Sequence, residues 1–190
     1  MNYFNTVKFF ALLFTSFFTF ITTCYAENQI QTVMAPVSSL ISNIQKTIAE
    51  VKAKTAIPVL FPTTIPVNSK QKKYFASSDL SQANQGNSYT INIDSTKDCH
   101  GIHYCNLGYV SAKKDANWQL YSDMANKNIT VPITLAHHIK GYFTPGHAMG
   151  DYFPANIQWK ENDVLYTISW DTTDTVILNM ANSAIKQGPN

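Results

Sequence analysis

Apolar and polar residues alternate along two neighbouring stretches near the end of the chain. Ile157 and Trp159 are separated by polar residues, and residues 164–170 carry apolar side chains at every other position. A polar turn, residues 160–163, lies between the two stretches. Period-two alternation on both sides of a short polar turn predicts a β-hairpin with one buried face.

The spacing of the apolar residues becomes helical after Asp171. The apolar positions that recur at this spacing are Val176, Ile177, Met180, Ala184 and Ile185. Thr172, Thr173 or Asp174 can cap the start of such a helix. Because the hairpin and the helix each have one apolar face, we expect them to pack against each other.

A second helical pattern lies near the start of the chain, in residues 37–54. The apolar stripe consists of Val37, Leu40, Ile41, Ile44, Ile48 and Val51. We expect one helix here that either docks on the domain, the simpler expectation, or remains a detachable arm that meets a partner. Pro58, Pro62 and Pro66 follow it and predict an extended segment without strand pairing.

The middle of the chain predicts further strands. Residues 73–77, 88–94 and 104–112 have strand patterns. Residues 129–135 and 138–143 predict a strand pair or a single bent strand. These elements predict an α+β fold, in which an antiparallel sheet of about five to seven strands is covered by an N-terminal and a C-terminal helix.

Between these strands, residues 113–127 are polar and ambiguous. Trp118, Leu120 and Tyr121 are the side chains in this stretch that we expect to point inward. We find no internal repeat in the chain.

The first 26 residues resemble a secretory signal peptide. An apolar run follows a short head with one cation, Lys8, and the small residues Cys24 and Ala26 suit a cleavage site. The residues before Cys24 do not fit a lipid-attachment signal, so lipid anchoring is not expected. We therefore expect an extracytoplasmic protein, either periplasmic or secreted, without a membrane span after cleavage. The expected organisation is a disordered segment (27–36), the helix (37–55) and a single domain (56–188).

The charge pattern bears on the class of partner. Lysine and arginine together number 14 against 12 acids, and all 14 are lysine. Bidentate recognition of phosphate depends on arginine, so a nucleic-acid partner is not expected. The chain also lacks the nucleotide-binding loops and the catalytic motifs with fixed spacing, so we expect no cofactor and favour a protein that is not an enzyme.

Cys99 and Cys105 remain after removal of the leader. Two cysteines in an exported chain usually pair, which predicts a disulfide that closes a short loop. The loop also contains His100 and His103, and two thiolates with two imidazoles are the alternative, a zinc site. Because the spacing fits none of the usual zinc patterns, the disulfide is the expectation.

The loop 144–154 is the second candidate site. Prolines bracket it, and its potential binding residues are His147, Met149, Asp151, Tyr152 and Phe153. With His137 and His138 upstream, a weak metal or copper-like site is the less favoured hypothesis. Packing of the loop on its own Tyr152 and Phe153, without a ligand, is the favoured expectation.

Several short motifs resemble an uncharacterised exported bacterial domain family of unknown function. The motifs are Ile57-Pro58-Val59-Leu60-Phe61-Pro62, Cys99-His100-Gly101 to Cys105, Gly141-Tyr142-Phe143, the Trp159 and Tyr166 hairpin, and Met180-Ala181-Asn182-Ser183. The resemblance covers roughly residues 56–186 and implies no catalytic residues. Relatives carry a second cysteine pair before the tryptophan strand, and this chain has none there.

Together these patterns favour an exported, non-enzymatic domain that binds a protein, a peptide or an envelope component. The expected contact surfaces are an exposed sheet edge, the loop 144–154 and, if it does not dock on the domain, the helix 37–54. The alternative is a secreted hydrolase or metal-dependent enzyme that uses histidines of the 100–103 and 137–147 segments.

Overall fold

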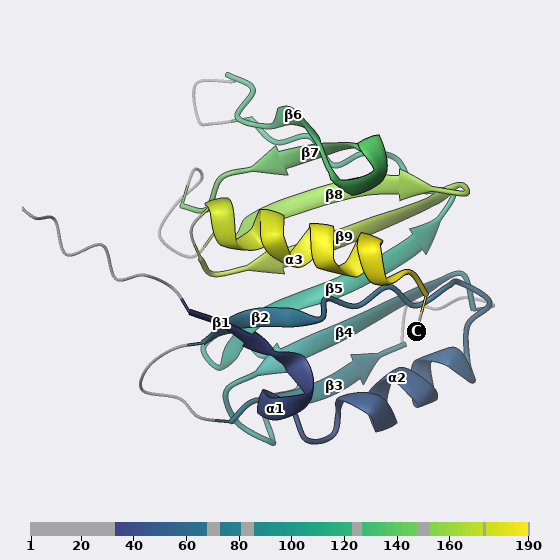
Figure 1. Cartoon of the computed structure of the whole chain (residues 1–190), viewed down its shortest axis with the longest axis vertical. Coiled ribbons are helices and arrows are strands. Elements are labelled where there is room, and N and C mark those ends of the chain that lie inside the picture. Colours follow the sequence, from purple (N-terminus) through teal and green to yellow (C-terminus); the bar gives the residue numbers. More distant parts are fainter. Residues whose placement is uncertain are drawn as a thin grey trace, which may run out of the picture. The chain divides into compact units, whose positions relative to one another are not determined.

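The computed structural model describes residues 33–67, 73–80, 86–122, 127–147, 153–172 and 174–189. Within them the fold is α+β, as predicted, with a seven-stranded antiparallel sheet, a two-stranded sheet and three α-helices (Figure 1). The expected signal peptide lies outside the described residues. The elements are β1 (Val33–Pro36), α1 (Val37–Leu40), α2 (Ile44–Lys52), β2 (Thr64–Val67), β3 (Phe75–Asp79), β4 (Ser88–Asp94), β5 (Asn106–Lys114), β6 (Val131–Thr134), η2 (Ala136–His138), β7 (Lys140–Thr144), β8 (Ala155–Glu161), β9 (Val164–Trp170) and α3 (Asp174–Gln187).

The order of strands in the large sheet is β3-β4-β5-β9-β8-β7-β6. Two meanders, β3-β4-β5 and β6-β7-β8-β9, meet where β5 pairs with β9. Since β6 forms the far edge, the chain that leaves β5 has to pass β9, β8 and β7 before β6 begins. Residues 115–122 and 127–130 belong to this connection, and we call them the crossing segment.

The predicted hairpin is formed by β8 and β9. Ile157 pairs with Ile168, and Trp159 pairs with Tyr166. The Trp159 and Tyr166 rings stack with their centroids 5.4 Å apart. The turn contains two residues rather than the predicted four, because Asn162 and its successor have φ values of 48° and 63°, which suit a tight two-residue hairpin turn.

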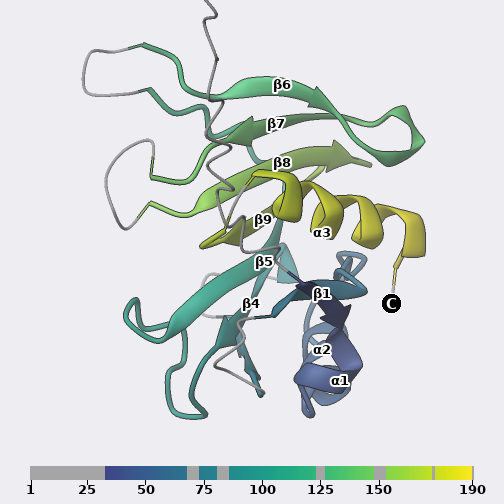
Figure 2. The same cartoon turned by 60° about the vertical axis from the view of Figure 1, so that its left-hand side comes forward.

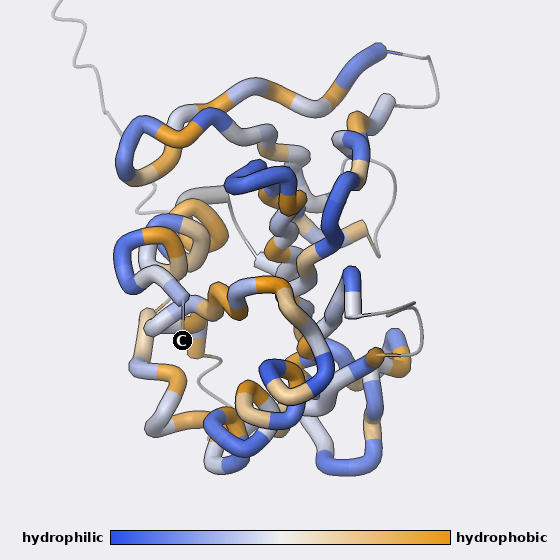
Figure 3. Tube along the Cα trace, turned by 90° about the vertical axis from the view of Figure 1, so that its right-hand side faces the viewer, coloured by the Kyte–Doolittle hydropathy of each residue, from blue (hydrophilic) through white to orange (hydrophobic). Residues whose placement is uncertain are grey.

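α3 covers the face of the sheet that carries Ile157 and Ile168, which we call the inner face. Figure 2 shows α3, α1, α2 and the β1–β2 pair on this one side of the sheet. Met180 and Ala184 of α3 are fully buried. The predicted packing of helix on hairpin is therefore confirmed, and Figure 3 shows the alternation of hydrophilic and hydrophobic residues along the helices that such packing requires.

Two polar residues fix α3 in place. The Ala136 N–H donates a hydrogen bond to Asn182 Oδ1 at 2.7 Å, and the Thr63 N–H donates to Ser183 Oγ at 3.1 Å. The motif Met180 to Ser183 therefore joins the helix to η2 and to the segment before β2.

The N-terminal helix differs from the prediction of one helix over residues 37–55. The chain forms α1 and α2 and interrupts the helix at Ile41, whose backbone is extended (φ −116°, ψ 94°). Ile41 is fully buried and forms a bridge with Tyr74, whose N–H donates to the Leu40 carbonyl at 3.0 Å. Pairing with the sheet thus replaces helical hydrogen bonds at this point. Ile48 is 5% exposed and the rest of the apolar stripe is buried, so the helical region docks, as expected.

The segments on both sides of this helical region also correct the prediction. Residues 33–36, assigned to a disordered segment, form β1, and the proline-containing residues 64–67, expected to be unpaired, form β2. Met34 pairs with Pro66. A two-stranded sheet tolerates a proline because each strand has one edge without a partner, where a missing N–H costs no ladder hydrogen bond.

The remaining strands lie close to their predicted positions. β4 has the predicted bounds, and residues 129–143 form the strand pair β6–β7 rather than one bent strand. Leu120 was expected to point inward, but its side chain is 53% exposed because it lies in the crossing segment, outside the sheet. No helix among the described residues is both long and apolar enough to cross a bilayer.

The edge of the sheet at β3 is closed by a side chain. Asn43 Nδ2 donates to the Ala76 carbonyl at 2.7 Å, and the Ala76 N–H donates to Asn43 Oδ1 at 3.1 Å. A carboxamide therefore occupies the position where the backbone of another strand would pair. At the opposite edge, Pro132 stands inside the short strand β6 and has no N–H to offer a further strand.

Candidate functional site

The outer face of the sheet carries neutral polar side chains. Side chains alternate along a strand, so the residues between the apolar positions point to the face opposite α3. The register places them in two rows across β4, β5, β9 and β8. The rows are Thr90, Ser111, Thr167 and Gln158, and Asn92, Tyr109, Ser169 and Asn156.

The crossing segment covers the part of this face that lies over β8 and β7. Gln158, 1% exposed, accepts a hydrogen bond from the Gln119 N–H at 2.9 Å and donates one to the Gln119 carbonyl at 2.9 Å. Its carboxamide therefore pairs with the segment as a neighbouring strand would. The Asn156 side chain accepts a further hydrogen bond from Gln158 Nε2 at 3.1 Å.

Further contacts hold the segment to the outer face. The Thr130 and Thr144 hydroxyls are 2.9 Å apart in a buried hydrogen bond. The Trp118 ring meets the Tyr142 ring edge to face at 4.9 Å between centroids. Two of the three expected anchors of this region, Trp118 and Tyr121, thus make ring contacts, the second with Phe153 at 5.1 Å.

Beside the crossing segment, the outer face over β4 and β5 forms a groove of about 460 Å³, which we call the outer groove. Its floor consists of Thr90, Asn92, Tyr109, Ser111 and Thr167, and Gln119 stands at its side. A volume of this size lies within the range of small-ligand sites.

The polar groups of the outer groove differ from Gln158, Thr130 and Thr144 in one respect. Within the described part of the chain, the side chains of Thr90, Asn92, Ser111 and Thr167 make no hydrogen bond, although all four are at least partly buried. The buried polar side chains Gln158, Thr130 and Thr144 are hydrogen-bonded. A ligand in the groove could therefore bond to these groups without breaking hydrogen bonds within the protein.

Tyr109 lies at the boundary between the groove and the covered part of the face. Burial raises the pKa of its phenol, and the nearby Ser169 hydroxyl lowers this pKa by a smaller amount. The Ser169 Oγ is fully buried and makes no hydrogen bond of good geometry to a described residue. The phenol stays protonated and can donate at neutral pH.

The disulfide loop lies at one end of the outer face, next to the outer groove. Cys99 and Cys105 are joined, as predicted. Gly101 packs so closely on the floor that an added Cβ would lie 2.8 Å from Asn92 Nδ2. Asp94, which is 1% exposed, accepts hydrogen bonds from the Gly101 N–H at 3.3 Å and from Asn106 Nδ2 at 2.9 Å. The bridged loop is thereby tied to β4 and β5 next to the groove.

The loop 144–154 is only partly described. Met149, Asp151 and Tyr152 lie outside the described residues. The His147 N–H donates to the Phe153 carbonyl at 2.7 Å, which brings the two ends of the loop together. His147 Nε2 lies 3.5 Å from Asp171 Oδ1, and both side chains are mostly exposed.

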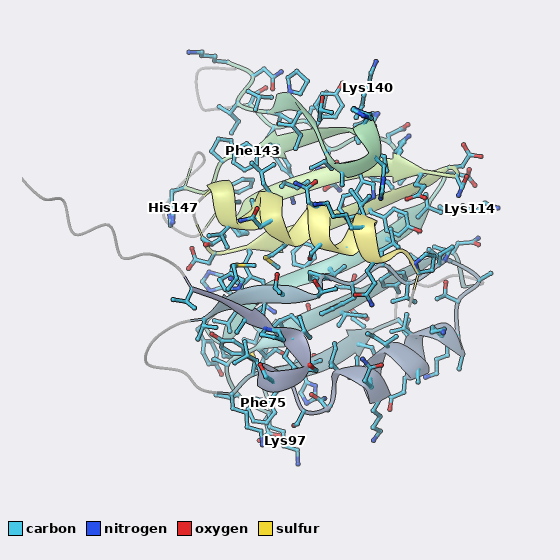
Figure 4. The ribbon with its side chains drawn as sticks, in the orientation of Figure 1. Phe75, Lys97, Lys114, Lys140, Phe143 and His147 are labelled. Atoms are coloured by element: carbon cyan, nitrogen blue, oxygen red, sulfur yellow. A yellow bond between two sulfur atoms is a disulfide. The ribbon has the colours of Figure 1, made fainter. Side chains whose placement is uncertain are left out.

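The histidines proposed for a metal or a hydrolase do not converge. His137 and His138 lie in the β6–β7 connection, beside Lys140, whereas His147 follows β7 at the other end of the sheet; Figure 4 shows Lys140 and His147 at these two ends. His100 and His103 belong to the disulfide loop, and His100 is exposed. Among the described residues, no three histidine, cysteine or acidic side chains are placed to hold a metal.

Sequence reasoning did not single out the residues of the outer groove. Its only sequence signal is the run of serine, threonine and asparagine between apolar residues in β4 and β5, a pattern that also describes an ordinary solvated strand face. Comparison with family models, with curated proteins and with solved structures finds no match.

Proposed function

We propose that the protein is an exported binding module that holds an envelope component in the outer groove. The observation that carries this proposal is the set of polar side chains on three adjoining strands, Thr90, Asn92, Ser111 and Thr167, that make no hydrogen bond to another described residue. A ligand that bonds to them would gain affinity without ordering any mobile segment of the floor.

The arrangement of the sheet favours the groove over the contact surfaces expected from the sequence. Strand addition by a peptide needs an open edge, and Asn43 occupies one edge while Pro132 weakens the other. The helices α1 and α2 use their apolar residues in the core, so they present no apolar stripe to a partner.

Co-sedimentation with isolated bacterial envelope fractions tests the proposal. We expect the purified protein to pellet with an envelope fraction. The variant Thr90→Val/Ser111→Ala/Thr167→Val should remain in the supernatant, because it keeps the shape of the floor and loses three hydroxyls.

The matched control is Thr134→Val, which removes one hydroxyl from an exposed position of the edge strand β6, away from the groove. It should pellet like the unchanged protein, and equal urea midpoints would show that all proteins are folded. Pelleting of the triple variant at the level of the unchanged protein would overturn the proposal, as would failure of the unchanged protein to bind any fraction.

A further inference from the structure

We infer that the ligand of the outer groove is an uncharged saccharide. The inference rests on the proposed function, because it names the class of envelope component that the groove would hold. It is carried by the chemistry of the floor and by the positions of the charged and apolar residues around it.

The hydrogen-bonding groups of the floor match a ligand rich in hydroxyls. Each hydroxyl of Thr90, Ser111 and Thr167 can donate one hydrogen bond and accept others, and the Asn92 amide offers two donors and an acceptor. A sugar hydroxyl has the same dual character, so either partner can donate at each contact. A ligand that carries only acceptors, such as a phosphodiester, would use the donors of the floor and leave its acceptors without partners.

The distribution of charge argues against an ionic ligand. Asp79 and Lys113 are the charged residues that line the groove, one of each sign. Both come from its borders, where β3 and β5 end, and not from the floor. The chain contains no arginine to hold a phosphate or carboxylate in two places.

Lipid tails and peptides fit the groove less well. The lining has two aliphatic residues, Ala112 and Leu165, and the side chain of Ala112 lies on the inner face, so the groove has too little apolar surface to bury an acyl chain. Tyr109 adds one aromatic ring with a polar end, which suits a ligand with both a C–H surface and hydroxyls. The floor strands β4, β5 and β9 already have strand neighbours on both sides, so a peptide gains no backbone pairing there.

The test treats the envelope fraction before the protein is added. Mild periodate cleaves vicinal diols, and muramidase cleaves glycan strands that lack them. Proteinase K removes protein and a phospholipase C removes lipid headgroups. We expect periodate or muramidase to abolish pelleting, and we expect the proteinase and the phospholipase to leave it unchanged.

Soluble competitors complete the experiment. A panel of uncharged di- to tetrasaccharides, including N-acetylglucosamine and glucose oligomers, is titrated against the bound protein, with inorganic phosphate and a glycine-serine peptide as controls. At least one saccharide should displace the protein, and the variant Thr90→Val/Thr167→Val should bind that saccharide about tenfold more weakly, as expected when hydrogen bonds of the site are left unmade.

The outcomes separate the two proposals. Groove-dependent pelleting could survive periodate and muramidase but be abolished by proteinase K or the phospholipase. In that case the saccharide inference is wrong, while the proposal of a binding module is still supported. If groove-dependent pelleting survives all four treatments and no saccharide competes, the saccharide inference is likewise wrong. If the groove variants pellet with the envelope fraction to the same extent as the control Thr134→Val, both proposals are wrong.

Discussion

At the scale of single residues, the Gln158 carboxamide determines where the crossing segment lies. It bonds to both the N–H and the carbonyl of Gln119, and it stands on a strand whose other face is apolar core. A glutamine in the pattern Ile-Gln-Trp predicts a strand residue opposite the core. The sequence does not indicate that the backbone of Gln119, 39 residues earlier, forms hydrogen bonds with this side chain.

The substitution Gln158→Ala should lower the free energy of unfolding by about 2 kcal/mol, because two backbone groups of the crossing segment lose their partner and a buried space opens. Urea denaturation followed by tryptophan fluorescence measures this change. Gln119→Ala is the matched control, since it keeps both backbone bonds and removes an exposed side chain; we expect a loss below about 1 kcal/mol. Equal losses in both variants would contradict this role of Gln158.

The tyrosines that hold the proline-containing segment make stability dependent on high pH. The Tyr166 hydroxyl donates to the Pro58 carbonyl at 3.1 Å, and burial, with a smaller contribution from Glu161, raises the pKa of Tyr166 from 10.0 to about 12. Burial also raises the pKa of Tyr89, whose hydroxyl accepts from the Leu60 N–H at 3.2 Å. Both groups are protonated in the folded state when the unfolded chain already ionises.

Because the folded pKa is the higher one, the stabilisation is complete below pH 10.0 and is lost as the pH rises toward about 12. Urea midpoints at about pH 9 and about pH 11 should therefore differ more for the unchanged protein than for Tyr166→Phe. The variant begins less stable, since it lacks the hydrogen bond to Pro58, but it has one ionisable group fewer. An identical decrease in both proteins would contradict the role of Tyr166.

At the scale of elements, period-two and helical patterns sufficed for β4, for the β8–β9 hairpin and for α3. Each of these elements has one buried face, so the spacing of its apolar residues matches the spacing of its buried positions. The interruption between α1 and α2 could not be predicted, because Ile41 fits the helical stripe and leaves the helix only to pair with Tyr74. Strand β1 was missed for a similar reason, since its pairing with a proline-containing strand depends on the rest of the fold.

The Asn43 carboxamide at the edge of β3 leads to a prediction at this scale. Asn43→Ala should lower the free energy of unfolding by about 1–2 kcal/mol, because the Ala76 N–H and carbonyl both lose a partner. The exposed edge should also promote self-association, which analytical ultracentrifugation detects.

Two variants sharpen this test. Ser42→Ala changes the neighbouring exposed residue and should have no effect on stability or association. Asn43→Asp keeps an acceptor for the Ala76 N–H but sets a carboxylate against the Ala76 carbonyl, so it should also be destabilised. A monomeric Asn43→Ala protein with unchanged stability would show that the edge does not need this side chain.

At the scale of the whole molecule, the disulfide loop and the outer groove meet at Asn92. We expect Cys99→Ser/Cys105→Ser to lose about 2 kcal/mol of stability, the value for closing so short a loop. The same variant should bind the envelope fraction more weakly, because Gly101 would no longer be held against the floor of the groove.

Reduction of the disulfide tests, without any substitution, whether the disulfide loop contributes to binding in the outer groove. Dithiothreitol should weaken pelleting of the unchanged protein and leave pelleting of Cys99→Ser/Cys105→Ser unaltered. Unchanged binding after reduction, with free thiols confirmed by titration, would show that the loop has no part in the groove.

The pairing of these cysteines was predictable from their number and from the expected compartment, whereas the groove beside them was not. Thr90, Ser111 and Thr167 become neighbours only because β9 returns to lie beside β5. Their sequence pattern is that of a hydrated strand face. These side chains make no hydrogen bond to another described residue because the crossing segment covers a different part of the outer face. No local sequence pattern predicts which part of the face that segment covers.

The position of β9 at the centre of the sheet also has a consequence for folding during synthesis. β5 ends at Lys114, and its second neighbour begins only at Val164. A chain that is synthesised from its N-terminus therefore has one edge of β5 unpaired until β9 has appeared. Such late, long-range pairing slows folding and exposes the nascent chain to misassociation, so the sheet cannot be completed until Val164–Trp170 have been synthesised.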